Sequence, residues 1–250
     1  MGVVGDPNSK RPLVLMSGTH GVEGFCGSAI QTNYLKTVLA VHPSNTVATM
    51  FVHGINSYGF SYLRRANENN IDLNRNFIDF NHLPNNAAYA KLAGTLARKP
   101  GAGTRASIAW QILKSGLRTV QDAFTRGQYD YPVGLFYGGR EASWSRGTWE
   151  KILATYLSRA KAVFYIDYHT GLGPYGYGQA IYPGSANSPL ANEVRRVYSE
   201  VKFLKTNDAV ATPPTGDILE FTMISRVASS LSFFGSPAEF VGKKRPFWSS

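Results

Sequence analysis

The chain has 250 residues, of which 43% are hydrophobic and 13% aromatic, a composition typical of a folded globular protein. The formal net charge is +10, but the basic residues are scattered and form no zinc-finger or RNA-recognition motif, which argues against nucleic acid as a partner. No apolar run is long enough to span a membrane, no secretory signal is visible, and the single cysteine, Cys26, excludes an internal disulfide. We therefore expect a cytoplasmic protein with no membrane partner.

The first half of the chain has the pattern of a βαβ unit. An apolar strand is predicted over residues 11–18, followed by a glycine-rich turn and a helix from Cys26 to about Ala40. The β-branched, apolar run 46–52 predicts a second buried strand. A helix between two strands favours an α/β fold with a mixed, mainly parallel central sheet flanked by helices. The long irregular segment that follows, 53–84, is of a length that is usually functional.

The second half contains further helices and one more clear strand. Helices are predicted over 85–98, 104–126, 147–160 and 187–204, with aromatic, glycine-rich stretches over 128–144 and 171–184. An apolar strand over 162–168 ends at His169. Because no repeat, low-complexity tract or change of composition divides the chain, we expect a single domain over residues 1–250.

The turn after the first strand holds residues that can carry chemistry. Glycine recurs at every third position from Gly18 to Gly27, which disfavours a helix and predicts a tight turn whose backbone approaches another segment closely. His20 and Glu23 lie in this turn, and His169 ends another strand, so the three would meet at one edge of the sheet. Two histidines, one carboxylate and an open fourth position form a catalytic zinc arrangement, and we expect one Zn²⁺ per chain.

Asp167 lies on the same face of its strand as His169, two residues before it. It is therefore either a hydrogen-bond partner of this histidine or an ordinary buried polar group.

Several strings resemble motifs of the zinc carboxypeptidase superfamily. Asp-Leu-Asn-Arg-Asn-Phe over 72–77 resembles its Asn-Arg motif, His20-Gly-Val-Glu23 resembles its first metal motif, and His169 resembles its third ligand. The fuller strings at 17–25, 134–139 and 168–173 are similar to an uncharacterised bacterial branch related to the aspartoacylase and succinylglutamate desuccinylase group. The resemblance covers roughly residues 11–240. Because the family usually has more structure at both ends, we expect a carboxypeptidase-like fold that is truncated at both ends.

The resemblance implies a hydrolase and a role for each motif residue. It implies that zinc is held by His20, Glu23 and His169, that Arg65 stabilises the oxyanion, and that Asn74 and Arg75 bind a substrate carboxylate. The planar fork of an arginine suits a carboxylate, and cations aimed at developing negative charge favour catalysis. The implied reaction is zinc-dependent hydrolysis, by metal-activated water, of an amide bond adjacent to a free carboxylate. Its substrate would be a small anionic molecule, either a peptide C-terminus or an N-acyl amino acid.

The general base is the least defined part of the implied site. The family uses a glutamate after a late strand, and Glu239, which follows the strand-like run 231–234, fits best. Glu220 is the second candidate. Residues 232–236 can be aligned with the same family region instead, and Phe233 then takes the place of the glutamate. In that alignment the chain is a catalytically impaired homologue that binds zinc and carboxylate.

Overall fold

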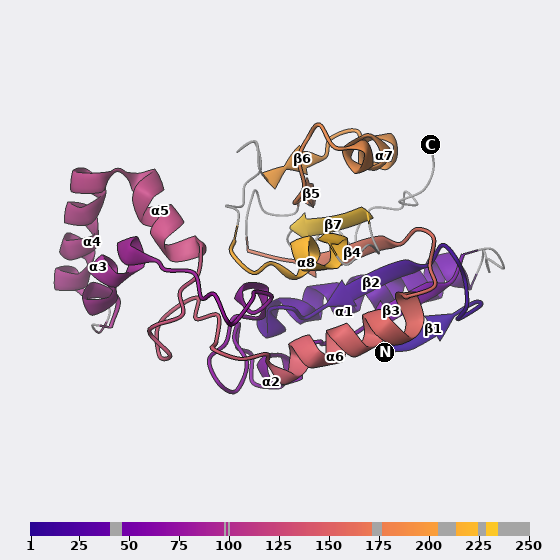
Figure 1. The fold of residues 1–250 in the computed structure, drawn as a ribbon, viewed down its shortest axis with the longest axis horizontal. Coiled ribbons are helices and arrows are strands. Elements are labelled where there is room, and N and C mark those ends of the chain that lie inside the picture. The colour runs from indigo at the N-terminus through magenta and orange to yellow at the C-terminus, as the bar shows by residue number, and fades with distance from the viewer. Residues whose placement is uncertain are drawn as a thin grey trace.

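The computed structural model describes residues 1–40, 47–97, 99, 101–171, 177–204, 214–224 and 229–234. These residues form one seven-stranded sheet with the order β1-β3-β2-β4-β7-β5-β6 (Figure 1). The strands are β1 (Gly2–Val4), β2 (Leu13–Ser17), β3 (Thr49–Val52), β4 (Phe164–His169), β5 (Gln179–Tyr182), β6 (Lys202–Phe203) and β7 (Ser229–Phe234). Only the pairs β1–β3 and β5–β7 within this described sheet are antiparallel. The predicted mixed, mainly parallel α/β fold is confirmed.

The helices are α1 (Gly24–Tyr34), α2 (Ser57–Ser61), α3 (Ala87–Leu96), α4 (Ala102–Ser115), α5 (Leu117–Thr125), α6 (Trp144–Ile152), α7 (Pro189–Val197) and α8 (Ile218–Ile224). Short 3₁₀ turns lie at Gly21–Glu23 and Leu73–Arg75, and wider turns extend α1 over Leu35–Leu39 and α6 over Leu153–Leu157. No helix in these described ranges has the length and apolar character needed to cross a membrane.

The structure differs from the sequence prediction at three places in the second half of the chain. The predicted helix 104–126 is two helices, because Gly116 has a φ of +83° and ends α4. Strand β5 lies inside the stretch predicted as a loop, and β6 lies inside the predicted helix 187–204. They are the last two strands on one side of the sheet, and both are too short for periodicity to reveal them.

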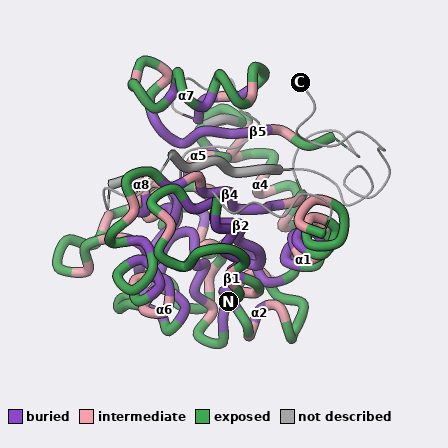
Figure 2. The backbone as a smooth tube through the Cα atoms, turned by 90° about the vertical axis from the view of Figure 1, so that its right-hand side faces the viewer, coloured by how far each residue is buried: buried purple, intermediate pink, exposed green. Residues whose placement is uncertain are grey.

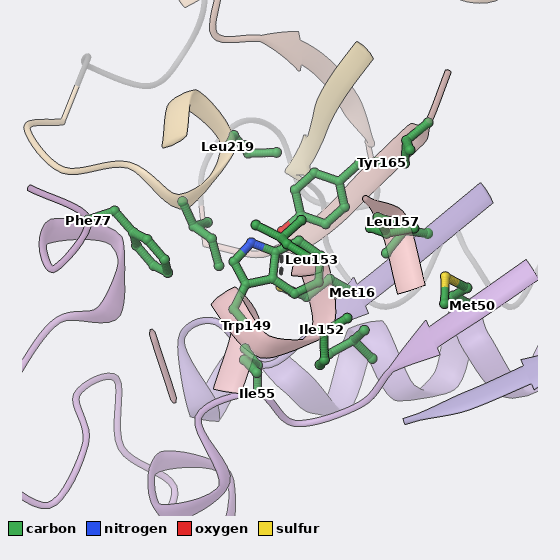
Figure 3. Packing of buried hydrophobic residues seen from close by; sticks show 14 of the residues in the cluster. Met16, Met50, Ile55, Phe77, Trp149, Ile152, Leu153, Leu157, Tyr165 and Leu219 are labelled. Carbon is green, nitrogen blue, oxygen red and sulfur yellow. Dashed lines mark hydrogen bonds between the residues drawn. The ribbon is translucent and has the colours of Figure 1, made fainter. Parts of the chain in front are cut away.

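Helices cover both faces of the sheet. One face packs against α6 and α8, and its core contains the fully buried Trp149. The Trp149 ring stacks on that of Tyr165, with the ring centroids 5.3 Å apart (Figure 3). Its indole nitrogen donates to the Thr222 hydroxyl at 3.0 Å. The other face packs against α1 and α7 through residues such as Leu15 and Val194. Figure 2 shows the result, with the buried strands β2 and β4 between more exposed helices.

Helices α3, α4 and α5 form a separate lobe that projects from the sheet (Figure 1). The three helices pack on each other around a small cluster of Leu92, Val120 and Ala123. Two side-chain contacts at the base of this helical lobe hold the start of α3 against the end of α5. The Asn86 amide donates to the carbonyls of Ala123 and Gly127 at 2.9 and 2.8 Å.

Gly27 allows α1 to pack closely against β2. A Cβ atom at this position would lie 2.5 Å from the Ser17 Cβ, so Gly27→Ala overpacks this contact. We expect it to lower the free energy of unfolding by about 1–3 kcal/mol, measured by urea denaturation. Gly94→Ala is the matched control, because Gly94 lies within α3 with no neighbour of its Cβ position within 4 Å. The control should stabilise the protein by about 0.5–1 kcal/mol, and equal effects of both variants would refute this interpretation.

Candidate metal centre

His20, Glu23 and His169 lie together at the carboxyl edge of the sheet. One ligand atom from each of them is within 4.8 Å of the others. The Nδ1 atom of His169 is 3.1 Å from both the Nδ1 atom of His20 and a carboxylate oxygen of Glu23, and His20 Nδ1 is 3.0 Å from the other Glu23 oxygen. All three residues are buried. The structure therefore brings together the residues that were predicted to hold zinc, and their role as ligands stays a prediction.

The glycine-rich turn after β2 is held against the loop that carries the arginines. A Cβ atom on Gly21 would overlap the backbone of Gly59 in α2, so the backbone approach predicted for this turn is observed. The backbone amides of Gly21 and Val22 donate to the carbonyls of Arg65 and Arg64 at 3.4 and 3.1 Å. This pairing fixes the position of His20 and Glu23 relative to Arg65.

Each histidine of the cluster also contacts a buried carboxylate through its other ring nitrogen. His169 Nε2 is 2.9 Å from Asp167, whose oxygens also accept from the Thr19 hydroxyl at 3.0 and 2.8 Å. His20 Nε2 is 3.2 Å from Asp72. In a neutral histidine, a carboxylate on the outer nitrogen holds the ring proton there, so that the lone pair of Nδ1 faces the metal, and this arrangement is typical of metal-ligating histidines.

The sequence indicates Asp167 as a hydrogen-bond partner of His169, but it does not indicate Asp72 as a partner of His20. The signal for Asp72 was its place in the Asp-Leu-Asn-Arg string, two residues before Asn74.

The charges of the cluster reinforce one another. Burial by itself raises the pKa of Glu23, but the neighbouring His20 and His169 outweigh it, and the pKa lies well below its ordinary value. Burial lowers the pKa of His169, but the carboxylates of Asp167 and Glu23 outweigh it and raise this pKa to about 10. Burial likewise raises the pKa of Asp72, but Arg65 with other cations outweighs it. The pKa of Asp72 therefore lies well below its ordinary range. Glu23 and Asp72 are therefore ionised at neutral pH, and His169 carries a proton that a metal must displace.

Arg65 lies beside this cluster. Its Nε donates to Asp72 at 3.0 Å and its Nη1 donates to Glu23 at 3.2 Å. Because 40% of its side chain is exposed, the guanidinium faces both the cluster and solvent. This placement suits the predicted role of Arg65 toward a substrate oxygen.

Asn74 and Arg75 are buried and bind backbone groups. The Nε atom of Arg75 donates to the carbonyl of Thr125 at the end of α5 at 2.9 Å, and its Nη1 donates to the carbonyl of Asn74 at 3.0 Å. The side-chain oxygen of Asn74 accepts from the backbone amide of Ile218 at 3.2 Å. In this conformation, both side chains connect the Leu73–Arg75 turn to α5 and α8. Their predicted contact with a substrate carboxylate stays a prediction.

Phe136 joins the two arginines. Its ring lies 5.3 Å from the guanidinium carbon of Arg65 and 5.3 Å from that of Arg75. Its φ of +55° is uncommon for a residue with a side chain, so the surrounding contacts hold the ring in this place. The sequence indicated this residue only as part of the string 134–139.

Of the two glutamates that are candidates for the general base, the structure describes only one. Glu239 lies outside the described residues, and Glu220 is half-buried in the first turn of α8. Strand β7 runs parallel to β4, with Phe233 opposite Tyr168 and Phe234 opposite His169. The Phe233 position of the alternative alignment is therefore beside the strand that ends in the metal cluster.

Asp217 is a further carboxylate that sequence reasoning did not single out. It directly precedes α8, and burial raises its pKa to about 6.

The fold is similar to that of solved carboxypeptidase-like structures. Carboxypeptidase A from Helicoverpa armigera is similar with a TM-score of 0.53 and 14% identity, over 98% of this chain and 55% of that one. Bovine thrombin-activatable fibrinolysis inhibitor is similar with a TM-score of 0.55 and 15% identity, over 90% and 71%. Succinylglutamate desuccinylase from Vibrio parahaemolyticus is similar with a TM-score of 0.50 and 11% identity, over 92% and 59%. At these identities the similarity shows the fold.

The chain belongs to the family described as protein of unknown function DUF2817, which matches residues 2–246. Among curated proteins, no sequence matches this chain. The chain spans a little over half the length of the carboxypeptidase A and desuccinylase structures.

Proposed function

We propose that this chain is a zinc-dependent hydrolase that cleaves an amide bond adjacent to a free carboxylate. The observation that carries this proposal is the cluster of His20, Glu23 and His169, with a buried carboxylate on the outer nitrogen of each histidine. Two imidazoles and one carboxylate are the donor set of known catalytic zinc sites, so the residues fit this metal. When bound, zinc supplies a Lewis acid that lowers the pKa of water and polarises a carbonyl group.

The side chains of the site then have separate tasks. Asp72 and Asp167 hold the proton of each histidine at Nε2, which directs Nδ1 toward the metal. Arg65 places a fixed cation where negative charge develops on the substrate oxygen. Glu239 would accept the proton of the attacking water as general base. The substrate carboxylate binds near Asn74 and Arg75, which requires Arg75 to share its donors between this carboxylate and the Thr125 carbonyl.

The substrate class rests on chemistry shared with the similar structures. One of them is named as a carboxypeptidase and another as a succinylglutamate desuccinylase. We therefore propose a peptide C-terminus or an N-acyl amino acid as the substrate. The cationic Arg65 beside the cluster supports an anionic molecule of this kind.

A second candidate function is zinc and carboxylate binding without hydrolysis. The alignment in which Phe233 takes the place of the glutamate carries this candidate, and β7, which contains Phe233, pairs with the strand that ends in the metal cluster. A phenylalanine in the position of the general base cannot accept a proton. Both candidate functions use the metal cluster, but only the first of them includes hydrolysis of a substrate.

Arg65→Ala tests the proposed hydrolysis. The zinc-loaded protein would be screened against N-acetyl amino acids and dipeptides, with turnover followed as release of free amine. We expect Arg65→Ala to lower kcat by about 10²–10³-fold, because one preorganised donor to the oxyanion is lost. Arg64→Ala is the matched control, since Arg64 is the exposed neighbour of Arg65 and should change kcat little. Zinc binding without any turnover would establish the second candidate, and absence of zinc binding would refute both.

Zinc affinity should rise with pH, because zinc must displace the proton of His169. With the pKa of His169 raised to about 10, we expect affinity to increase about tenfold per pH unit between about pH 7 and 9. Competition against a chromophoric chelator measures this slope. In Asp167→Asn the neighbouring negative charge is lost and the slope should become flatter over the same range. A wild-type affinity that is constant with pH would contradict the protonated His169.

A further inference from the structure

The outward face of α4 in the helical lobe is apolar and exposed. Trp110 is 62% exposed and Leu113 is 78% exposed, and Leu117 at the start of α5 is 54% exposed. Ala106 and Ala109 are also exposed and continue the face at helical spacing. We call Trp110, Leu113 and Leu117 the apolar face of the lobe.

This apolar face is not the one that holds the lobe together. Ile112 of α4 packs on the cluster of Leu92, Val120 and Ala123 inside the lobe. Helix α4 is thus apolar on two sides, and only the inner side is covered by the described part of the chain. The lobe projects from the sheet (Figure 1), so the outer side is open to a partner.

The lobe is strongly basic. Residues 85–127 contain seven lysines and arginines and a single acidic residue, Asp122, so the segment carries +6 of the formal net charge of +10. Exposed Arg105 and Lys114 lie on α4 beside the apolar face. A second copy of the lobe would bring like charges together, whereas an anionic surface complements them.

We propose that the helical lobe docks on an anionic lipid surface. Trp110, Leu113 and Leu117 would enter the headgroup region, and Arg105 with Lys114 would contact lipid phosphates. An exposed helix with tryptophan and leucine on one side and basic residues along its border is the pattern of interfacial membrane binding. The face belongs to a projecting lobe, which suits contact with a flat bilayer. This inference does not depend on the proposed hydrolysis.

Binding at the surface of a membrane differs from crossing the membrane. The sequence prediction of no membrane partner rested on the absence of a long apolar run, and surface binding needs none. The base of the lobe is tied to the Leu73–Arg75 turn beside the site by the contact of Arg75 with the Thr125 carbonyl. A docked lobe would therefore keep the metal cluster close to the lipid surface.

Vesicle sedimentation with the full chain tests the proposal. Vesicles of phosphatidylcholine alone would be compared with vesicles in which about one third of the lipid is phosphatidylglycerol. We expect at least about tenfold stronger binding to the anionic vesicles, and loss of that preference at high salt. A Trp110→Ser, Leu113→Ser double variant should bind at least about tenfold more weakly. Because both residues are exposed, this variant should keep the circular dichroism spectrum of the wild type.

Trp144→Ser is the matched control. Trp144 is 66% exposed, but it lies in α6 on the sheet and outside the lobe, so its loss should leave vesicle binding unchanged. An Arg105→Glu, Lys114→Glu variant should also lose the preference for anionic vesicles. A blue shift of tryptophan fluorescence on vesicle binding that disappears in Trp110→Phe would place this side chain in the lipid.

Three results would overturn the proposal. The first is equal or no binding to the two kinds of vesicle. The second is binding to heparin as tight as to anionic vesicles with no effect of the double variant, which would indicate a purely electrostatic polyanion site. The third is concentration-dependent self-association, removed by the double variant, in a protein that does not bind vesicles, which would make the apolar face an interface between two copies.

Discussion

Replacing His169 with alanine should reduce bound zinc from about one ion per chain to background. His169 contributes the ligand atom that comes from β4, and without it the remaining candidates, His20 and Glu23, come from a single turn. The variant also removes the buried imidazole that contacts Asp167 through Nε2 and Glu23 through Nδ1. Elemental analysis of dialysed protein measures the metal, and urea denaturation shows whether the variant is folded.

His82→Ala is the control for this experiment. His82 is an exposed histidine whose contact is with the exposed Asp79, at 2.7 Å. Its loss should leave the zinc content unchanged. If a folded His169→Ala variant retained one zinc per chain, the ion would be held elsewhere and the proposed centre would be wrong. If the wild type bound no zinc even after reconstitution, the resemblance would describe fold alone.

Asp72→Ala should be strongly destabilising, by about 3–5 kcal/mol, and should weaken zinc binding by about 10–100-fold. The buried Asp72 carboxylate contacts Arg65, His20 and the backbone amide of Asn74. Its removal leaves the cations around it without their common partner in a buried site, and this is the costly way to break a buried ion pair. Urea denaturation measures the first effect and chelator competition measures the second.

The pH dependence of the free energy of unfolding tests the stabilising role of Asp72 independently. Its pKa in the folded state is lowered well below the ordinary value, so its contribution is present above about pH 4 and is lost as the pH falls further. The difference in unfolding free energy between the wild type and Asp72→Ala should therefore shrink in acid. Asp79→Ala, at an exposed aspartate, should change stability by less than about 0.5 kcal/mol. A mild effect of Asp72→Ala at neutral pH would show that the carboxylate network does not support the fold.

The sequence by itself determined the central strands and their ends. Apolar runs predicted β2, β3 and β4 within a few residues, because a buried parallel strand needs continuous apolar side chains. The positions of His20 and His169 at strand ends then predicted that both would lie at one edge of the sheet. Glycine spacing predicted a close backbone approach, and the partner proved to be α2.

Only the tertiary structure decided which polar groups meet. The partnership of His20 with Asp72 joins residues that are 52 positions apart, and Arg75 binds a carbonyl 50 positions away. The same is true of Phe136 between two arginines, and of a lobe whose outer helix leaves an apolar face exposed. Residue patterns report burial and local backbone preference, which are properties of a segment. The partner of a hydrogen bond or charge is instead set by how distant segments pack, and no local pattern contains that information.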